Sequence, residues 1–301
     1  MDERAALALL SAELEDAGDD AAVVDDLVIT TDMLHERTDF PPGTTRYTAG
    51  WRAVGASLSD VAAMGAEATA AVAAYAAPAF DDGELLAFVR GARDVCERVG
   101  ASYVGGDLDE HQEFTVASTA IGRTDDLVFR SGARPGDAVC VTGTLGRSAA
   151  ALELFNRAGD GPARDDEDDL ERANALFQFE PRVAAGRTLA GYATAMMDSS
   201  DGLARSLHQL AEASDCGFTI DADRVPITDA LTDVADDDAV LDLATTFGED
   251  FELVVTLSES DLEAARSVTD VRLSRIGSVV TREDGITLDG EPLADRGYTH
   301  G

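Results

Sequence analysis

The stretch GWRAVGASLSDVAAMGAEATAAVAAYAA, residues 50–77, carries the clearest structural pattern in this chain of 301 residues. Four apolar residues recur in it at helical spacing: Trp51, Val54, Leu58 and Val61. This spacing predicts a helix over 47–64 that ends at Gly65. The alanine-rich run 66–77 is short and is followed by Pro78, which favours a strand. One helix followed at once by one strand indicates a sheet with helices packed on it.

The same alternation continues on both sides of this stretch. An amphipathic helix is predicted at 83–99 and an alternating strand at 114–122. A turn is predicted at Gly105-Gly106-Asp107, a strand end at Thr30-Thr31-Asp32 and an acidic loop over 159–169. Further helices are predicted at 3–15, 147–157, 169–178, 182–191, 202–213, 229–244 and 259–268, and further strands at 138–142, 193–197, 217–221, 251–257, 274–280 and 286–288. The polar junction SGARPGD at 131–137 separates the two halves. We therefore expect an α/β (α+β) protein with two domains, residues 1–131 and 132–301.

The composition excludes several classes of enzyme. The chain has 59 Asp plus Glu against 23 Lys plus Arg, a formal charge of −36, and every cation is Arg. A Walker A loop and a protein kinase both need a lysine on the nucleotide phosphates. Schiff-base chemistry needs a lysine amine. All three are excluded, while a hydrophobic fraction of 45% is ample for a folded core.

Cysteine usage and hydropathy indicate the compartment. Cys96, Cys140 and Cys216 lie far apart without CxxC spacing, which indicates a reducing environment, no disulfide framework and no zinc cluster. No apolar run approaches the ~20 residues of a membrane span, and the N-terminus MDERAALALL lacks a signal-peptide layout. We therefore expect a soluble, cytoplasmic protein.

The acidity itself predicts an environment and excludes partners. So negative a surface repels nucleic acid and anionic membranes, so neither is an expected partner. In about 1 M salt the Debye length falls to roughly 3 Å, and self-repulsion of this size becomes tolerable. We therefore expect a protein from a high-salt cytoplasm, in which most of the Asp doublets are solvated surface.

Five Asp-bearing segments differ from these surface doublets because each adjoins an apolar element and sits beside Gly, Ser or Thr. They are Gly18-Asp19-Asp20, Thr30-Thr31-Asp32, Ser59-Asp60, Gly105-Gly106-Asp107 and Asp198-Ser199-Ser200-Asp201-Gly202. Any one of them alone is typical of a helix cap or an Asx-turn. Asp60 differs most, because it shares a helix face with Val54 and Val61, where an unpaired carboxylate is costly. Carboxylates and hydroxyls together are the ligands that Mg²⁺ prefers, so the set predicts magnesium near a polyphosphate.

Other kinds of site receive less support. His35, His111, His208 and His300 show no metal spacing, and neither a GxSxG elbow nor a GxGxxG fingerprint occurs. Gly143-Thr144-Leu145-Gly146 precedes a predicted helix and could hold an anion on backbone N–H groups. A plain strand-to-helix turn explains that loop equally well.

In order and spacing, the motifs resemble the thiamine-monophosphate kinase family, of the superfamily that includes aminoimidazole-ribotide synthetase and selenophosphate synthetase. The resemblance runs from GDDAAVV at 18–24 to GYTH at 297–300. Its most specific stretches are TTDML (30–34), GWRAVGASLSDVAAMGA (50–66), GGD (105–107), RSGARPGD (130–137), VTGTLGRSAAALEL (141–154), DSSDGL (198–203) and FGEDFEL (247–253). It implies the two-domain aminoimidazole-ribotide-synthetase-like fold of mixed sheets flanked by helices, and a homodimer built on the N-terminal sheets.

The resemblance also implies roles for single residues. Those that match metal ligands are Asp19, Thr30, Thr31, Asp32, Asp60, Asp107, Asp198 and Asp201. Gly106, Arg130 and Ser200 match ATP contacts, and Glu249 matches a contact to the thiamine-side substrate. Asp39 stands before Phe40 where the family commonly has a substrate-contacting His. A second departure is at the end, where the chain stops at Gly301 instead of continuing to an aromatic residue.

The implied reaction is the phosphorylation of thiamine monophosphate by ATP, with two or more Mg²⁺ ions between the two phosphates. A phosphate monoester has its second pKa near 6, so the acceptor oxygen is anionic at neutral pH and no general base is required. No catalytic residue separate from the metal ligands is therefore expected. The N-terminal domain would bind Mg²⁺ and ATP, and the C-terminal domain would complete the substrate site. Two alternatives are an ATP-using enzyme of the same superfamily with another acceptor and a non-catalytic Mg-nucleotide sensor.

Overall fold

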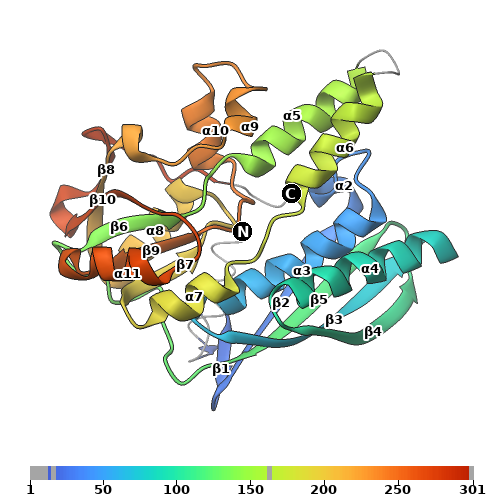
Figure 1. Ribbon diagram of the computed structural model, residues 1–301, viewed down its shortest axis with the longest axis horizontal. Coiled ribbons are helices and arrows are strands. Elements are labelled where there is room, and N and C mark those ends of the chain that lie inside the picture. The colour runs from blue at the N-terminus through green and yellow to red at the C-terminus, as the bar shows by residue number, and fades with distance from the viewer. Residues whose placement is uncertain (1–12, 15–17, 161–164, 298–301) are drawn as a thin grey trace.

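The computed structural model describes residues 13–14, 18–160 and 165–297, and its strands form two sheets (Figure 1). The first sheet has five strands in the order β1-β2-β5-β3-β4, and the second has seven in the order β12-β11-β8-β10-β6-β9-β7. Each sheet combines antiparallel pairs with one parallel pair, β3 with β4 and β11 with β8. The predicted fold class, mixed sheets flanked by helices, is confirmed. The helix predicted at 3–15 falls almost wholly outside the described residues.

The five-stranded sheet carries its helices on one face. Its strands are β1 (Ala22–Val24), β2 (Leu27–His35), β3 (Glu67–Ala77), β4 (Ser102–Glu110) and β5 (Thr115–Arg123). The helices of this half are α2 (Glu36–Asp39), α3 (Arg46–Ala63) and α4 (Asp82–Arg98). Figure 1 shows α3 and α4 side by side over the sheet, with no helix of the described chain on its other face. The helix and strand predicted from residues 50–77 are therefore both present.

Two segments that were expected to be a turn or a strand end are internal strand. Gly105-Gly106-Asp107 lies within β4 and pairs with β3. Thr30-Thr31-Asp32 lies in the middle of β2, which pairs with β5 as far as His35. Both predictions were wrong because ladder bonds from neighbouring strands override a weak local preference. At Gly106 a Cβ atom would lie 1.7 Å from the Ala73 carbonyl oxygen, so close strand packing requires glycine there.

The seven-stranded sheet is covered by helices on both faces. Its strands are β6 (Ala138–Thr142), β7 (Ala193–Asp198), β8 (Cys216–Ile220), β9 (Leu253–Leu257), β10 (Leu273–Thr281), β11 (Ile286–Leu288) and β12 (Glu291–Pro292). The helices are α5 (Arg147–Asp160), α6 (Asp165–Phe177), α7 (Val183–Ala190), α8 (Leu203–Ser214), α9 (Asp229–Thr232), α10 (Val240–Thr246) and α11 (Leu262–Val268). Three short 3₁₀ turns are η1 (Ala222–Arg224), η2 (Glu259–Asp261) and η3 (Arg282–Asp284).

Two predictions for this half need correction. The single helix expected over 229–244 is two short helices, α9 and α10, separated by the acidic segment 233–239. Asp is a poor residue for a helix interior, and its side chain competes for backbone hydrogen bonds. Most of the described part of the segment expected as an acidic loop, 159–169, is helical, because α5 extends to Asp160 and α6 begins at Asp165.

Helix α3 belongs to both halves of the molecule. Fourteen of its residues are buried, among them Arg52 and Ser59. One apolar core contains α3 together with residues of α7, β7 and β9 from the seven-stranded half. Helix α7 crosses α3 so closely that a Cβ on Gly186 would lie 2.1 Å from the Ala62 carbonyl oxygen. The two halves therefore pack rigidly on one another, and the last turn of α3 faces the end of β7.

Candidate functional site

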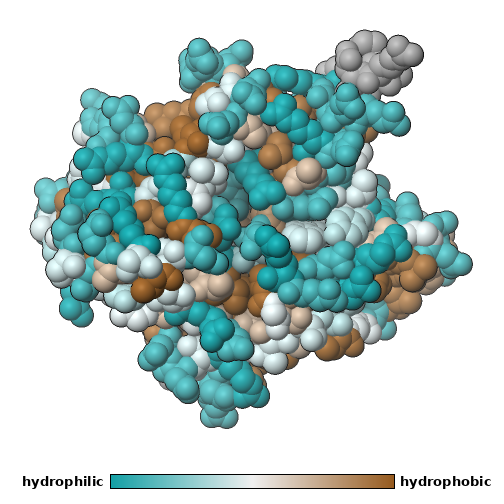
Figure 2. Space-filling view, in the orientation of Figure 1, coloured by the Kyte–Doolittle hydropathy of each residue, from teal (hydrophilic) through white to brown (hydrophobic). Residues whose placement is uncertain are grey.

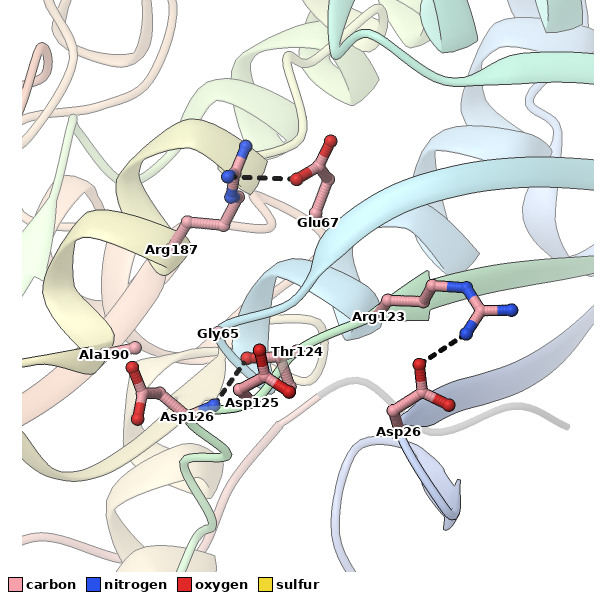
Figure 3. Close-up of a pocket in the computed structure, with 9 residues that line it drawn as sticks. All are labelled: Asp26, Gly65, Glu67, Arg123, Thr124, Asp125, Asp126, Arg187 and Ala190. Atoms are coloured by element: carbon pink, nitrogen blue, oxygen red, sulfur yellow. Dashed lines mark hydrogen bonds and ion pairs between the residues drawn. The ribbon is translucent and has the colours of Figure 1, made fainter.

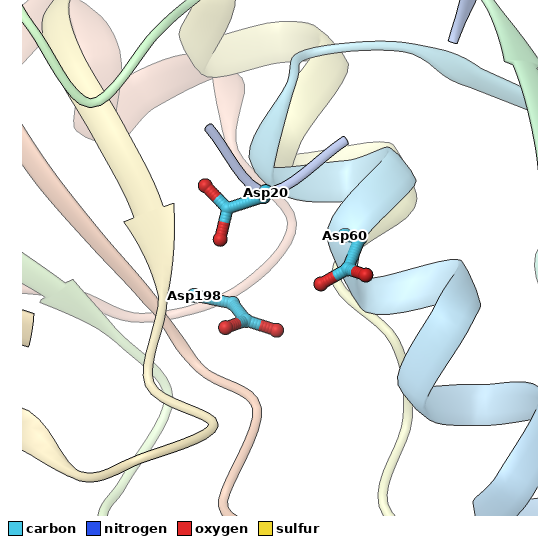
Figure 4. A group of neighbouring side chains, drawn as sticks. All are labelled: Asp20, Asp60 and Asp198. Atoms are coloured by element: carbon cyan, nitrogen blue, oxygen red, sulfur yellow. The ribbon is translucent and has the colours of Figure 1, made fainter. Parts of the chain in front are cut away.

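Three carboxylates from distant parts of the chain meet where the two halves join. Asp20 precedes β1, Asp60 lies in the last turn of α3, and Asp198 ends β7. One oxygen of each lies within 4.8 Å of an oxygen of the others, and Figure 4 shows the three side chains around a common space. We call Asp20, Asp60 and Asp198 the acid cluster.

A hydrogen bond from strand β2 holds the Asp60 carboxylate in the cluster. Thr30 Oγ1 of β2 donates a hydrogen bond of 2.5 Å to Asp60 Oδ2. Burial, followed by the charges of Asp32, Asp198 and Asp20, raises the pKa of Asp60 well above its usual range. Without a cation, ionised Asp60 is therefore unfavourable.

Asp198 is fully buried and is fixed by two donors. Ser59 Oγ donates to Asp198 Oδ2 at 2.6 Å, and the Ser200 amide donates to Oδ1 at 3.1 Å. Burial, together with the nearby charge of Asp20, raises the pKa of Asp198 to about 7. Asp198 is the cluster member contributed by the seven-stranded half.

Arg130 and the loop before β1 position Asp20, the third member of the acid cluster. Asp20, with its side chain 1% exposed, accepts from Arg130 Nη2 at 2.9 Å and from Nε at 3.2 Å. The Arg130 amide donates to Asp19 Oδ1 at 2.6 Å. Burial raises the pKa of Asp19. Asp19 thus anchors the loop through the Arg130 backbone, and Asp20 is the residue whose carboxylate enters the cluster.

The donor set fits a hard divalent cation. The acid cluster offers only oxygen atoms, and the hydroxyls of Thr30 and Ser59 orient two of the carboxylates. Mg²⁺ takes oxygen ligands and usually binds through a few carboxylates plus substrate phosphates. Burial and the neighbouring charges raise the pKa values of Asp60 and Asp198, and a bound cation would reverse that penalty.

The remaining predicted ligands lie at different distances from the cluster. Asp32 accepts from Ser57 Oγ of α3 at 2.7 Å and shares the helix-facing side of β2 with Thr30. Thr31 points to the opposite side, where its hydroxyl donates to the Ser118 carbonyl at 2.9 Å. Alternation along a strand makes this separation unavoidable, since successive side chains face opposite sides. The structure therefore brings Asp32, and not Thr31, near Asp60.

Gly106 and Asp107 lie far from the cluster within the described chain. In register, Asp32 pairs with Ser118 and Ala73 pairs with Gly106, so β5 and β3 separate β2 from β4. Three strand spacings amount to about 14 Å. Asp107 is exposed, and its carboxylate accepts only from the neighbouring Leu108 amide at 2.9 Å among the contacts of the described residues.

Ser200 and Asp201 follow Asp198 in the turn before α8 and are half-buried. Besides its amide bond to Asp198, Ser200 accepts from the Glu249 amide at 2.6 Å through its carbonyl oxygen. Asp39, predicted on the substrate side, is buried and accepts from the His35 amide at 2.6 Å and from Thr38 Oγ1 at 2.8 Å. Those bonds hold the α2 turn in place.

Glu249 forms a buried ion pair between the two halves. Its Oε2 accepts from Arg52 Nη2 at 2.5 Å, and Arg52 is 1% exposed. The Arg52 guanidinium also donates to the Phe177 carbonyl at 3.0 Å and stacks on the Phe177 ring, 3.7 Å from its centroid. Glu249 has a φ of +61°, an unusual conformation for a non-glycine residue. The pair fixes the loop before β9 onto α3.

The other two acids of the FGEDFEL segment also have partners within the protein. Asp250 accepts from the Gly146 amide at 2.6 Å and from the Ser148 amide at 2.9 Å, at the start of α5. The helix N-terminus that was a candidate phosphate loop thus holds a carboxylate of the same chain. Glu252 accepts from Arg182 at 2.5 and 2.7 Å and from Thr142 Oγ1 at 2.6 Å.

Two site residues were not assigned from the sequence. Asp20 was quoted with Asp19, but neighbouring side chains in an extended loop point in different directions, and sequence does not show which one turns inward. Arg52 had a signal: it is the only charged residue of helix α3 between its first residue, Arg46, and Asp60. A single arginine on an otherwise uncharged helix indicates a buried ion pair.

A surface hollow of about 430 Å³ lies apart from the acid cluster and is shown in Figure 3. Four of its charged residues form two ion pairs: Arg187 lies 3.0 Å from Glu67, and Arg123 pairs with Asp26. Exposed pairs of this kind contribute little binding energy, so this hollow carries no chemistry comparable to that of the acid cluster.

Comparison with known proteins identifies relatives over nearly the whole chain. Residues 18–124 match the family AIR synthase related protein, N-terminal domain, and residues 134–289 match AIR synthase related protein, C-terminal domain. The thiamine-monophosphate kinase of Halobacterium salinarum is 63% identical over 100% of both chains. That of Escherichia coli K12 is 32% identical, covering 94% of this chain and 90% of its own length.

Solved structures agree with these matches. The structure of AaThiL complexed with AMPPCP and TMP superposes with a TM-score of 0.87 at 27% identity, covering 100% of this chain and 97% of that chain. The thiamine-monophosphate kinase of Stenotrophomonas maltophilia K279a gives a TM-score of 0.80 at 30% identity, with 96% of both chains covered.

Proposed function

The chain belongs to the thiamine-monophosphate kinase family, and on that premise we propose that it transfers the γ-phosphoryl group of ATP to thiamine monophosphate, giving ADP and thiamine diphosphate. The observation that carries the proposal is the acid cluster at the junction of the two halves. Phosphoryl transfer between two polyanions is limited by their repulsion, and a site for cations between them addresses that obstacle directly.

Two or more Mg²⁺ ions would be held by the acid cluster, with Asp19, Thr30, Asp32 and Asp201 close by. Bound there, Mg²⁺ supplies Lewis-acid neutralisation of phosphate charge. Thr30 and Ser59 keep the carboxylates oriented through hydrogen bonds of 2.5 and 2.6 Å. Ser200, which follows Asp198 in the same turn, would contact a phosphate oxygen of ATP.

Arg130 would assist at the ATP phosphates. Its guanidinium is one of 23 cations in a chain without lysine, and it already lies against Asp20. With Asp20 engaged in holding a cation, Arg130 would be able to bind a phosphate, whose oxygens its guanidinium matches in geometry. No base is needed, because the acceptor phosphate is already anionic at neutral pH.

On the substrate side, Glu249 and Asp39 would act indirectly, by holding the backbone around the thiamine-monophosphate site in place. Both carboxylates are buried and already accept hydrogen bonds within the protein. We propose that they hold the loop before β9 and the α2 turn in position around thiamine monophosphate. Gly106 and Asp107, on the exposed strand β4, would reach ATP only across a subunit contact.

We also propose that the protein forms a homodimer through the five-stranded sheet. Val24, Met33 and Val72 are exposed large hydrophobic residues whose side chains lie on the face away from α3 and α4. Figure 2 shows hydrophobic residues along the lower right edge, where β3 and β4 lie. Exposed apolar residues gathered on one helix-free sheet face are typical of an interface. The N-terminal domain, residues 1–131, would then provide Mg-ATP binding and dimerisation, and residues 132–301 would complete the substrate site.

The compartment follows from the substrates. No helix in the described part of the chain is long and apolar enough to cross a membrane. We propose that the enzyme acts in the cytoplasm, where ATP is available. The halophilic source of the 63% identical relative agrees with the acidic composition.

A coupled ADP-release assay tests the function. It combines the protein with ATP, Mg²⁺ and thiamine monophosphate in about 1 M KCl, where the acidic chain is screened. ADP should appear with thiamine monophosphate and not with thiamine, which lacks the acceptor phosphate. ADP release with another phosphorylated acceptor instead would favour a different enzyme of the superfamily. Nucleotide binding without ADP release would favour a sensor.

A further inference from the structure

A second hollow, of about 460 Å³, lies in the seven-stranded half and gathers arginines. It is lined by Asp223, Arg224, Val225, Arg266, Arg272, Leu273, Ser274 and Arg275, and we call it the arginine hollow. Four of the 23 arginines of the chain line it, against a single acid, Asp223. Gathering like charges in one place is unfavourable, and an anion would relieve the repulsion.

The arginine hollow is separate from the acid cluster. Leu273 pairs with Thr142 on β6, while Asp198 pairs with Leu253 on β9, the strand next to β6. The hollow and the cluster are thus three strands apart at one end of the sheet, about 14 Å. Figure 1 shows β8, β10 and α11 on the left of the molecule, away from α3 and α4.

The arginines are only partly neutralised by the protein. Three have an acid from their own surroundings: Arg224 with Asp221 at 2.8 Å, Arg266 with Glu263 at 2.8 Å, and Arg275 with Glu259 at 3.1 Å. Arg272 is exposed and has no carboxylate within ion-pair distance among the residues that the structure describes. Its guanidinium is therefore available to a ligand.

Buried polar atoms in the hollow point to the same conclusion. Ser274 is 7% exposed, yet its hydroxyl has no hydrogen-bond partner within the described chain. Arg275 Nε is also buried and lacks an aligned acceptor there, although Glu259 lies 3.1 Å away. Buried polar atoms are nearly always satisfied, and Arg275 Nε has Glu259 within ion-pair distance, so the Ser274 hydroxyl is the donor of this lining that lacks an acceptor within the described chain.

From these observations we infer that the arginine hollow binds a small molecule bearing a phosphate or diphosphate group. Arginine forks match phosphate oxygens in geometry, and Ser274 Oγ can donate to the same group. The volume is in the range of small-molecule sites, roughly 300–1,000 Å³, and Val225 and Leu273 supply an apolar wall. A nucleic acid is a poor fit, because the rest of the chain is strongly negative.

Calorimetric titration with inorganic pyrophosphate tests the inference. The titration is run in EDTA, so that the acid cluster holds no magnesium, and in about 1 M KCl, so that only direct contacts contribute. The wild-type chain should bind pyrophosphate, and Arg272→Gln should bind it at least about tenfold more weakly. Ser274→Ala should weaken it as well. The matched control Arg282→Gln removes an exposed arginine outside the hollow, paired with Asp215, and should bind as the wild type does.

Three outcomes overturn the inference: no binding by the wild type, equal affinity in wild type and Arg272→Gln, or equal weakening in Arg282→Gln. The titration is repeated with Mg²⁺ in place of EDTA: pyrophosphate that binds only then, and equally well to Arg272→Gln, would lie in the acid cluster and would also overturn the inference. Because the titration involves no turnover, its result is independent of the outcome of the ADP-release assay.

Discussion

Asp60 and the surface aspartates are chemically identical, and only their surroundings separate their roles. Asp238 is exposed in an acidic run, whereas Asp60 faces Asp20 and Asp198 across a buried space. Burial of a carboxylate beside two others costs free energy of folding unless a cation is bound. Under the proposed function, the acid cluster would lower the stability of the metal-free protein and be stabilised when a cation binds.

Asp60→Asn should remove most of the activity while the fold is retained. The amide keeps the size and the contact with Thr30 but removes one charge from the cation site. We expect a loss of at least about 100-fold in kcat/KM, on the scale of removing one electrostatic group from a transition state. The ADP-release assay measures the activity and circular dichroism the fold. Near-normal turnover at saturating Mg²⁺ would contradict the assignment, and Asp238→Asn, an exposed substitution, serves as the matched control.

Glu249→Ala should chiefly destabilise the protein. The change leaves the Arg52 guanidinium buried without its carboxylate, which typically costs about 3–5 kcal/mol of the free energy of unfolding. Urea unfolding measures the loss. The control Glu263→Ala breaks an exposed pair and should cost no more than about 1 kcal/mol. Unchanged stability together with a raised KM for thiamine monophosphate would instead make Glu249 a direct substrate contact.

At the scale of elements, α5 and the loop before β9 are joined by one carboxylate. Asp250 accepts two amide hydrogen bonds at the start of α5 and is buried there. Burial raises the pKa of Asp250 to about 6, even though both hydrogen bonds act in the opposite direction. The folded state therefore holds this proton at pH values where the unfolded chain, with a pKa near 3.8, has released it.

Asp250→Asn should remove a pH dependence of stability. With the folded pKa raised, the Asp250 contribution falls as pH rises from about 4 to about 6, by roughly 2–3 kcal/mol in all. The wild type should therefore lose stability relative to Asp250→Asn between pH 4.5 and pH 7 by about that amount. Urea unfolding at the two pH values measures the difference. A constant difference between the two proteins would show that Asp250 does not titrate in this range, and Asp238→Asn again provides the control.

Elements could be predicted wherever their signal is local. The periodicity of residues 50–64 and of 83–99 is complete within each segment, and α3 and α4 form as expected. The turn predicted at Gly105-Gly106-Asp107 was wrong because this strand forms by pairing with β3, more than 30 residues earlier in the chain. The break between α9 and α10 was missed because apolar residues on both sides preserved the helical spacing.

At the scale of the whole molecule, the charge of −36 acts on every element at once. Lowering KCl from about 1 M to about 0.1 M lengthens the Debye length from roughly 3 to 10 Å, so self-repulsion grows. We expect the melting temperature to fall as salt is removed. Differential scanning calorimetry measures it, with a neutral osmolyte at matched osmolality as the control. Full stability in dilute buffer, or full rescue by the osmolyte, would rule out charge screening as the cause.

The sheet face without helices predicts the assembly. Light scattering after size exclusion in molar KCl should give twice the chain mass of 31.5 kDa. Met33→Asp combined with Val72→Asp places charges on that face and should yield monomers, because apolar burial at an interface does not tolerate unpaired charge. Leu86→Asp, at an exposed position of α4, should leave the dimer intact. A monomeric wild type would contradict the proposed interface.

The sequence alone determined the alternation of helices and strands, the excess of acid and the short list of unusual aspartates, because each of these is a local property. It excluded lysine-dependent phosphate binding for the same reason. The tertiary structure alone decided which acids meet. Asp20, Asp60 and Asp198 converge because α3 packs against β7 from the other half, whereas Asp250 turns to a helix start and Glu249 to Arg52. Residue type and formal charge are properties of the sequence, but the pKa of a carboxylate depends on neighbours that are brought close only by folding.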